Sequence, residues 1–244
     1  VQNNNLSSAH LNFITDNLNK KLKNEKWIKR KGLQFHWHNR DYNSFDDFLS
    51  KLKSSKRKAI RKERRTIMNN NLVIQKVTGN ELNNEIWDSF YNFYINTIDK
   101  KWGGAYLTKK FFYSINKTMK NKILLIIAKQ NNKIVAGALN FIGSNTLYGR
   151  NWGSIVDIPF LHFELCYYQA MEYAIDNNIK TVEAGDQGHH KIQRGYIAQS
   201  TYSRHLIQNE SFAKAIRNFV QLEEKEIDRQ IQLINEQGSP YSNI

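Results

Sequence analysis

The stretch KILLIIAKQNNKIVAGALNF, residues 122–141, decides the fold. Its two apolar runs each have the length of a strand, and the Asn131-Asn132 pair between them is typical of a hairpin turn. A turn at Gly143-Ser144 follows, and residues 145–152 read as a third strand. Three adjacent strands therefore form the centre of the chain, and the other elements are placed around them.

Helices and further strands follow this centre. An acid and a proline open a helix at Asp157 that runs to about Asn177, and the short run 180–182 then reads as a strand. A further strand over 201–207 and a closing helix near 211–234 complete the chain. The helix after Asp157 has a buried face at helical spacing, made of Leu161, Leu165, Tyr168, Met171 and Ile175.

A strand and two helices precede the centre. Residues 72–77 read as the strand, and a helix over 81–97 comes next. Thr108 is placed to cap the second helix, 109–119, because a threonine hydroxyl can accept a hydrogen bond from a first-turn backbone N–H.

The first forty residues predict strand, helix and strand. Residues 7–15 alternate loosely, Asp16 caps a helical run to Lys26, and residues 27–39 return as a strand. We expect the last part of an α/β domain whose N-terminal portion is missing, because the sequence opens at Val1 as if inside an element. Period-two alternation places Leu33, Phe35 and Trp37 on one face of the second strand, and Gln34, His36 and His38 on the other.

The composition bounds the class of protein. With 244 residues, 40% of them hydrophobic, the chain can bury a core, and no run reaches the roughly 18 apolar residues of a membrane span. Its single cysteine, Cys166, excludes an internal disulfide and fits a reducing compartment. The net charge of +14 attracts polyanions such as RNA, phosphorylated substrates or anionic lipid headgroups. We expect a cytoplasmic protein, for which peripheral contact with a membrane stays open.

The segment 51–65 carries nine Lys or Arg and one acid. Ser44, followed by two acids, marks the start of the helical region before it. A solvated charged face is the ordinary interpretation, but this density in one helix is self-repulsive without an anionic partner. We therefore expect the helix to bind phosphate groups through Lys56, Arg57, Arg61 and Lys62.

The loop EAGDQGHHKIQRGY, residues 183–196, holds the densest group of reactive side chains. Glycines there let the backbone turn and approach a ligand, and loops at strand ends carry sites disproportionately. If strands 145–152 and 180–185 are neighbours, one crevice joins the loop to the start of the following helix. The general base for an amine stays open among Glu183, Asp186 and His190. The crevice residues are Arg150, His162, Glu164, Glu183, Gln187, His190, Lys191 and Arg194.

Three other chemistries find less support. Zinc is the rival interpretation for the histidines, but no cysteine pair or third ligand lies at metal spacing in the sequence. The Gly-x-Ser-x-Gly elbow of serine hydrolases and the Gly-x-x-x-x-Gly-Lys loop of nucleotide kinases are both missing from it. We therefore expect no metal. The histidines concerned are His36, His38, His162, His189 and His190.

Several segments together resemble the Fem-type proteins. Phe48-Leu49-Ser50 followed by KRKAIRKE, residues 56–63, is similar to their serine- and lysine-rich signature with Arg-x-x-Ile-Arg-Lys. The loop 183–196 extends the resemblance, which covers about residues 7–220. Four further segments resemble the bacterial FemAB-like branch, which is labelled peptidoglycan biosynthesis or recognition: FHWHNR (35–40), GALNF (137–141), YGR (148–150) and HFELCYY (162–168).

The resemblance implies an α/β fold of the GNAT type, that of acyl-CoA N-acyltransferases, in which helices flank a mixed sheet. The order of the predicted elements agrees with that fold. Fem-type proteins carry two GNAT-like domains, so we expect a complete second domain over residues 72–208 and a truncated first one over residues 1–41. A basic helical connector, residues 42–71, would join them, and a C-terminal helix, residues 209–244, would follow.

The resemblance also implies transfer of an aminoacyl group from charged tRNA to an amine, on a peptidoglycan precursor. The basic segment would bind the tRNA, and no cofactor is expected because the donor is itself a substrate. Glu183 or His190 would handle the proton. The implied substrate-binding residues are His36, His38, Arg40, Tyr148, Arg150, His162, Glu164, Gln187, Lys191 and Arg194.

Two departures from family patterns leave alternatives open. The Arg/Gln-x-x-Gly-x-Gly/Ala loop of CoA-using GNAT enzymes is missing before the helix that opens at Asp157, which weakens acetyl-CoA as donor. The Fem-type Phe-Lys-x-x-Phe-Gly is replaced by HKIQRG, residues 190–195, so donor and acceptor specificity are expected to differ. One alternative is an N-acyltransferase that uses a CoA thioester. The other is a non-catalytic protein that recognises a cell-wall polymer or another polyanion.

Overall fold

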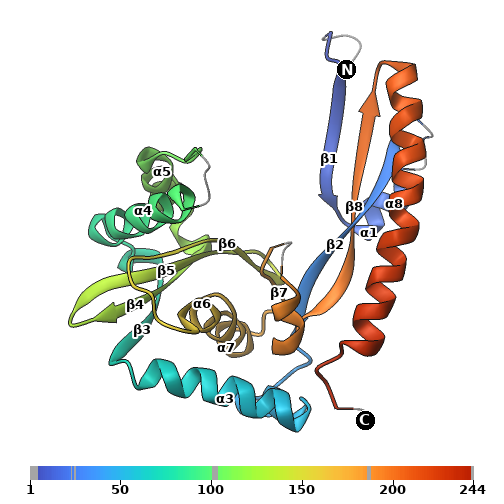
Figure 1. Ribbon diagram of the computed structural model, residues 1–244. Helices are drawn as coiled ribbons and strands as arrows, with labels where there is room; N and C mark the ends of the chain where they lie inside the picture. The colour runs from blue at the N-terminus through green and yellow to red at the C-terminus, as the bar shows by residue number, and fades with distance from the viewer. Residues whose placement is uncertain (1–4, 23, 25, 101–103, 186–187, 243–244) are drawn as a thin grey trace. The chain divides into compact units, whose positions relative to one another are not determined.

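The computed structural model describes residues 5–22, 24, 26–100, 104–185 and 188–242. The chain forms two compact units (Figure 1). The first consists of Val1–Phe35 and Asp186–Ser239, and the second of His36–Gly185 and Pro240–Ile244. The long strand β2, Ile28–His38, contributes to both. The α/β class predicted from the sequence is confirmed, whereas the predicted domain boundaries stay a prediction.

The second unit is built on a mixed sheet in the order β2-β7-β6-β5-β4-β3. The predicted hairpin is confirmed, because β4 pairs with β5 and β5 with β6, each antiparallel. The β6–β7 pair is parallel, so the chain must cross between these strands through a helix. The strands are β3 (Leu72–Thr78), β4 (Ile123–Gln130), β5 (Lys133–Ile142), β6 (Thr146–Ser154) and β7 (Thr181–Glu183).

Helices α4, Asn84–Asp99, and α5, Lys109–Met119, cover one face of this sheet (Figure 1). The Thr108 hydroxyl accepts a hydrogen bond from the backbone N–H of Phe111, as the capping prediction requires. The aromatic side chains of α4 pack on alternate residues of β4 and β5, and burial of this apolar surface stabilises the layer. Two short 3₁₀ turns, Gly79–Glu81 and Lys120–Lys122, link the layer to the sheet.

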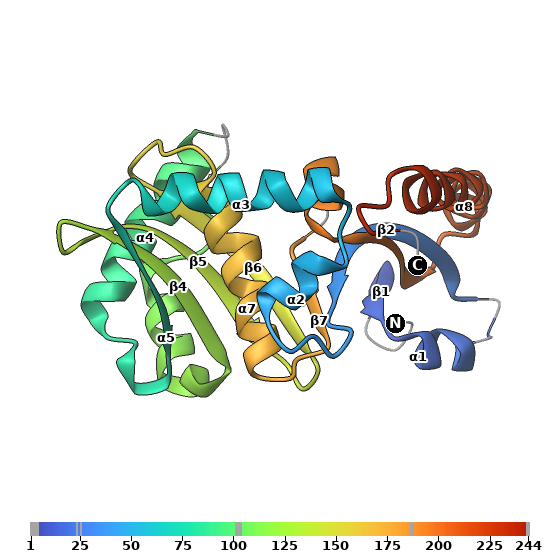
Figure 2. The ribbon, with the colours of Figure 1, turned by 90° about the horizontal axis from the view of Figure 1, so that it is seen from below.

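The opposite face carries α2, α3 and the crossover helix (Figure 2). Contrary to the prediction, the crossover helix starts at Leu161 and not near Asp157, because Phe160 takes a left-handed conformation with φ of 69° and stops helical hydrogen bonding before it. One turn of this helix is a π-helix, a form frequent at functional sites. The elements are α2 (Phe45–Ser50), α3 (Ser54–Met68), α6 (Leu161–Phe163), the π-turn η4 (Glu164–Tyr168) and α7 (Gln169–Asp176).

The first unit has the strand order β1-β8-β2, and the long helix α8 runs along it. Its first helix is capped by Thr15 and not by Asp16 as predicted, because the Thr15 hydroxyl accepts from the Leu18 N–H. Ile28 packs against Ala213 and Val220 of α8. The elements are β1 (Ser8–Ile14), α1 (Asp16–Lys21), the 3₁₀ helix η5 (His189–Arg194), β8 (Ile197–Ile207) and α8 (Glu210–Gln237).

Three ion pairs also fasten β2 to α8: Lys29–Glu224, Arg30–Glu223 and Lys31–Asp228. Over the part of the chain that the structure describes, none of the helices has both the length and the apolar character needed to cross a bilayer.

Candidate functional site

The parallel strands β6 and β7 separate at one end, and this opening is the centre of the candidate site. They pair only from Thr146 to Tyr148, opposite Thr181 to Glu183. Beyond that point β6 continues to Ser154, whereas β7 ends. A cavity of about 120 Å³ lies there, lined by Gly149 and Arg150 on β6 and by Ala184 and Gly185 after β7. The strands themselves therefore leave room for a ligand.

A β-bulge aims Arg150 at this opening. On β5, Leu139 faces Asn151 and the next residue, Asn140, faces Gly149, so Arg150 has no partner in the register. Bulges of this kind often lie beside active sites, where they redirect a side chain. Gly149 allows the close approach of β7, because a Cβ there would lie 3.1 Å from the backbone oxygen of Glu183.

Glu183 lies in a row of polar side chains that crosses three strands. Tyr148 is its register partner on β6 and His36 its partner on β2, so the three side chains share one face. The Nε2 atom of His36 is 3.6 Å from the Glu183 carboxylate. Burial raises the pKa of Glu183, and the nearby positive charge of Arg150 partly offsets this rise. A carboxylate in these surroundings is a better proton acceptor than an exposed one.

His162 forms the aromatic wall of the cavity. Its ring lies 5.3 Å from the ring of Trp152 and 5.3 Å from that of Tyr167, each measured between centroids. Cys166 also lines the cavity, and it belongs to the same π-turn as Tyr167. The π-turn thus supplies two lining side chains from consecutive positions, which a regular helix would direct elsewhere.

His38 and Arg40 lie at the end of β2. The Nδ1 atom of His38 is 3.4 Å from the hydroxyl of Thr181, its cross-strand partner. The Arg40 guanidinium lies 4.6 Å from the ring centre of Tyr241. His38 and Thr181 therefore form a second polar pair between β2 and β7, next to His36 and Glu183. Arg40 lies against Tyr241 in the C-terminal segment.

Glu164 is buried and already engaged. Arg64 donates to both of its oxygens, at 3.0 and 3.2 Å, and the Gln169 amide donates at 2.7 Å. Arg64 also pairs with Glu172 at 2.6 Å. In this structure the Glu164 carboxylate therefore joins the π-turn to α3, and a role in substrate binding stays a prediction.

The remaining predicted residues of the loop 183–196 belong to the first unit. His190 is exposed overall, but partial burial of its ring and the positive charges of Arg194 and Lys191 lower its pKa. Lys191 is fully buried, with Nζ 5.8 Å from the Phe35 ring centre. Arg194 is also buried, and it donates to the backbone oxygen of His190 at 2.8 Å. Two further predicted residues, Asp186 and Gln187, lie outside the described residues.

Some cations of the basic helix α3 are engaged by other residues and some are exposed, and Arg61 is both. Arg57 donates to the backbone oxygens of Ser50 and Leu52, at the end of α2. Arg61 pairs with Asp46 at 3.1 Å. In this structure Arg57 is therefore engaged in helix packing, and its role in polyanion binding stays a prediction. Lys56 and Lys62 make no ion pair with another described residue. The cations on the exposed side of α3 are Lys58, Arg61, Lys62 and Arg65.

Sequence reasoning missed several residues at this site, among them Asn140, Trp152 and Arg64. Asn140 is buried in β5 and lines the cavity, and a lone polar residue in an apolar strand was the signal that could have found it. Trp152 gave no comparable signal, nor did Arg64, one of many cations on its helix. Among the residues that the structure describes, no three His, Cys, Asp or Glu side chains gather in a way that could hold a metal ion.

Comparison with known proteins gives a family and a fold. A family model for FemAB-like proteins, described as peptidoglycan biosynthesis/recognition, matches residues 1–243. No curated protein matches the sequence. Among solved structures, the C-terminal domain of a putative lysylphosphatidylglycerol synthetase from Agrobacterium fabrum aligns with a TM-score of 0.63 at 9% identity, covering 87% of this chain and 72% of that one.

Two more structures have the same fold. FemX aligns with a TM-score of 0.58 at 11% identity, covering 86% of this chain and 68% of that one. L-PGS from Bacillus licheniformis aligns with a TM-score of 0.55 at 8% identity, covering 90% and 73%. At such low identities the likeness establishes the fold.

Proposed function

The chain belongs to the FemAB-like family, and from that premise we propose that it is an aminoacyltransferase. It would move an aminoacyl group from a charged tRNA to an amine on a peptidoglycan precursor. The observation that carries this proposal is the combination of Glu183, whose pKa burial raises, with the nearby positive charge of Arg150, which lines the cavity between β6 and β7. An aminolysis site needs a base and a positive charge close together.

The proposed chemistry is a direct attack. The amine nitrogen of the acceptor attacks the carbonyl carbon of the aminoacyl ester, and a C–N bond forms. Glu183 takes the proton that the nitrogen loses, and the positive charge of Arg150 stabilises the oxyanion. The ester C–O bond then breaks, and the tRNA hydroxyl leaves with a proton returned from Glu183. The products are an amide and free tRNA, with no net change in protons.

The surroundings of Glu183 suit this role. His36 lies 3.6 Å away on the neighbouring strand and can hold the carboxylate in place. The cavity of about 120 Å³ is small, and we propose that it takes the acyl group and not the whole donor. Of the bases left open by the sequence, Glu183 is our choice, because the cavity lies beside it. His190 is the alternative.

We choose tRNA as the carrier of the donor because of the positive charge of α3. The exposed cations of α3 offer a surface for the phosphates of tRNA, and phosphate contacts supply most of the affinity of such complexes. The pyrophosphate loop of CoA-dependent GNAT enzymes has no counterpart before the crossover helix. A CoA thioester is therefore the second choice of donor, to be decided by experiment.

The test offers labelled aminoacyl-tRNAs and, separately, acyl-CoAs to the full chain and reads the products by mass. The acceptors are peptidoglycan precursors, free amines and phosphatidylglycerol vesicles. The vesicles are included because one protein of similar fold is named as a putative lysylphosphatidylglycerol synthetase. We expect label to move from tRNA to an amine.

The variants Glu183→Gln and Arg150→Ala should lose about 100-fold or more in turnover, a typical cost of removing a base or an oxyanion-stabilising group. Lys133→Ala, at the exposed first residue of β5, is the control and should keep full activity. Label that moves only from CoA would replace the donor. If no donor gives a product, recognition is the better account; full activity in Glu183→Gln would remove Glu183 as the base.

A further inference from the structure

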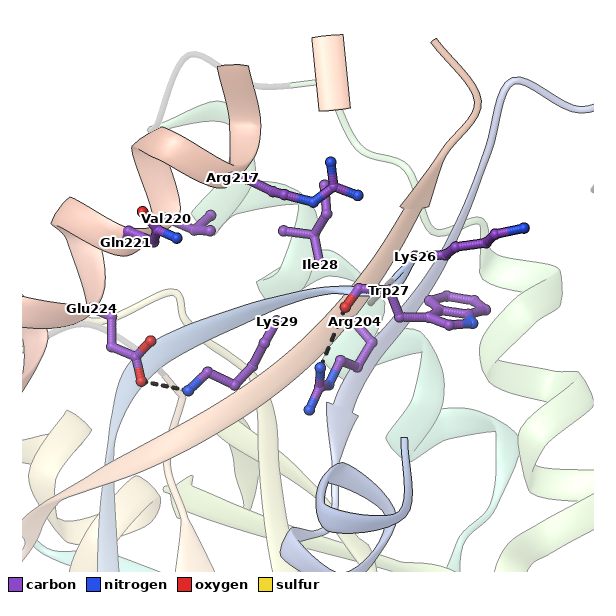
Figure 3. A pocket seen from close by; sticks show the side chains of 9 residues that line it. All are labelled: Lys26, Trp27, Ile28, Lys29, Arg204, Arg217, Val220, Gln221 and Glu224. Carbon is purple, nitrogen blue, oxygen red and sulfur yellow. Dashed lines mark hydrogen bonds and ion pairs between the residues drawn. The ribbon is translucent and has the colours of Figure 1, made fainter. Parts of the chain in front are cut away.

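The first unit holds a pocket of about 690 Å³ formed by the start of β2, by β8 and by α8 (Figure 3). Its lining combines a tryptophan, two aliphatic side chains and an excess of cations. The residues are Lys26, Trp27, Ile28, Lys29, Arg204, Arg217, Val220, Gln221 and Glu224. A lining of this kind suits a ligand that is partly apolar and negatively charged.

The one carboxylate of the lining is already neutralised. Glu224 accepts a hydrogen bond from Lys29 at 2.6 Å, and Figure 3 shows this pair at one end of the pocket. Beyond this pair the lining has three more cationic side chains, Lys26, Arg204 and Arg217, and no second acid. The net charge of the lining is therefore positive, and its field attracts an anion.

Arg204 adds a positive charge to the lining that no described acid neutralises. Its guanidinium donates to the Asn19 side-chain oxygen at 3.0 Å, to the Asn19 backbone oxygen at 2.9 Å and to the Trp27 backbone oxygen at 3.3 Å. All three acceptors are neutral, and none of the described carboxylates pairs with it. Burial lowers the pKa of Arg204. The charge is thus fixed in position and only partly solvated, a state that a bound anion would relieve.

We propose that this pocket binds a phosphate ester. The phosphate would lie against Arg217 and Lys26, in the field of Arg204, and charge-assisted hydrogen bonds would hold it. The organic part of the ester would rest on the Trp27 ring and on the apolar side chains of Ile28 and Val220. The acyl transfer proposed above needs none of these residues, so this site is a function beyond it.

A free phosphate ester and a phospholipid headgroup offer the same chemistry, and the probes separate them. Adenosine monophosphate and glycerol 3-phosphate represent free esters with and without a flat ring. Vesicles of phosphatidylglycerol represent the headgroup, with zwitterionic phosphatidylcholine vesicles as the reference without net charge. Binding to the full chain is measured by titration calorimetry for the esters and by sedimentation with the vesicles.

The variant Arg217→Glu tests the site, and Lys214→Glu is its matched control. Both lie on α8 and make the same change of charge, but only Arg217 lines the pocket. We expect Arg217→Glu to weaken binding about tenfold or more, because a hydrogen bond to a charged group is removed. Lys214→Glu should change it less than about twofold. Trp27→Leu should weaken adenosine monophosphate more than glycerol 3-phosphate, because only the former carries a ring that can stack.

Each result has a clear meaning. Binding of the esters supports a soluble ligand, and binding of phosphatidylglycerol vesicles alone supports a headgroup. Equal losses in Arg217→Glu and Lys214→Glu would overturn the pocket, because the attraction would then be that of the whole basic surface. No binding of any probe would overturn it as well. Circular dichroism and the melting temperature of each variant separate loss of the site from loss of the fold, and Arg217→Gln supplies a milder change if Arg217→Glu unfolds.

Discussion

Removal of the Arg64 side chain should destabilise the second unit much more than removal of an exposed cation from the same helix. The Glu164 side chain is only 5% exposed, and Arg64, itself 17% exposed, donates to both of its oxygens. In the variant Arg64→Ala, the Gln169 amide is the one donor to this carboxylate that remains among the described residues. Glu172 loses its 2.6 Å partner too, although Lys76 remains 3.6 Å from it.

The expected cost follows from burial. Breaking a buried ion pair by removing one partner typically costs about 3–5 kcal/mol, because a charge stays buried without compensation. For a chain of 244 residues this corresponds to a fall in melting temperature of about 6–20 °C. Arg65→Ala, the next residue on the same helix, is exposed, and it should cost less than about 0.5 kcal/mol.

The assay is urea unfolding followed by circular dichroism, with the double variant Arg64→Ala/Glu164→Gln as the decisive sample. Neutral glutamine removes the uncompensated charge, so the double variant should be more stable than Arg64→Ala alone. A cost below about 1 kcal/mol, or no recovery in the double variant, would refute the view that this pair holds the π-turn to α3.

Two further predictions concern the proposed reaction and its donor. Glu183 must be unprotonated to act as a base, and burial raises its pKa, so the acidic limb of the pH profile of kcat/KM should lie above pH 4.5. The variant Arg150→Ala should move this limb to still higher pH, because it removes the cation that lowers the pKa of Glu183. A limb that does not move would contradict the interaction between Arg150 and Glu183. The double variant Lys62→Glu/Arg65→Glu should weaken RNA binding. It should also lower the slope of log K against log salt by about 0.7–0.9 for each phosphate that the variant no longer binds. Weaker binding with an unchanged slope would mean that neither residue contacts a phosphate.

Local patterns in the sequence predict most of the fold. Period-two alternation, the Asn131-Asn132 turn and the Thr108 cap each act over a few residues, and the structure has all three. The sequence places the start of the crossover helix too early because Asp157 and Pro159 are ordinary signals of a helix start. The left-handed Phe160 that delays it is a conformation that side chains of this size rarely adopt, and no local rule foresees it.

The candidate site is harder to predict from the sequence, because its geometry depends on pairs of residues that are distant along the chain. The polar face of β2 is predicted to carry His36 and His38, but its meeting with Glu183 depends on the pairing of β2 with β7. The role of Glu164 cannot be read from its position in the helix. Its partner, Arg64, lies 100 residues earlier among eight other Lys and Arg, and only packing distinguishes one cation from the rest.

The backbone, more than any side chain, forms the opening between β6 and β7. β7 has three residues, and after Ala184 the chain turns through Gly185, whose φ of 76° is one that glycine adopts readily. The bulge at Arg150 breaks the ladder at the same level on the other side. Substitutions of Glu183 or Arg150 should therefore change the chemistry and leave the cavity open, whereas a β-branched residue at position 185 should close or distort the cavity while both reactive groups remain. This difference separates the groups proposed to react from the backbone that positions them.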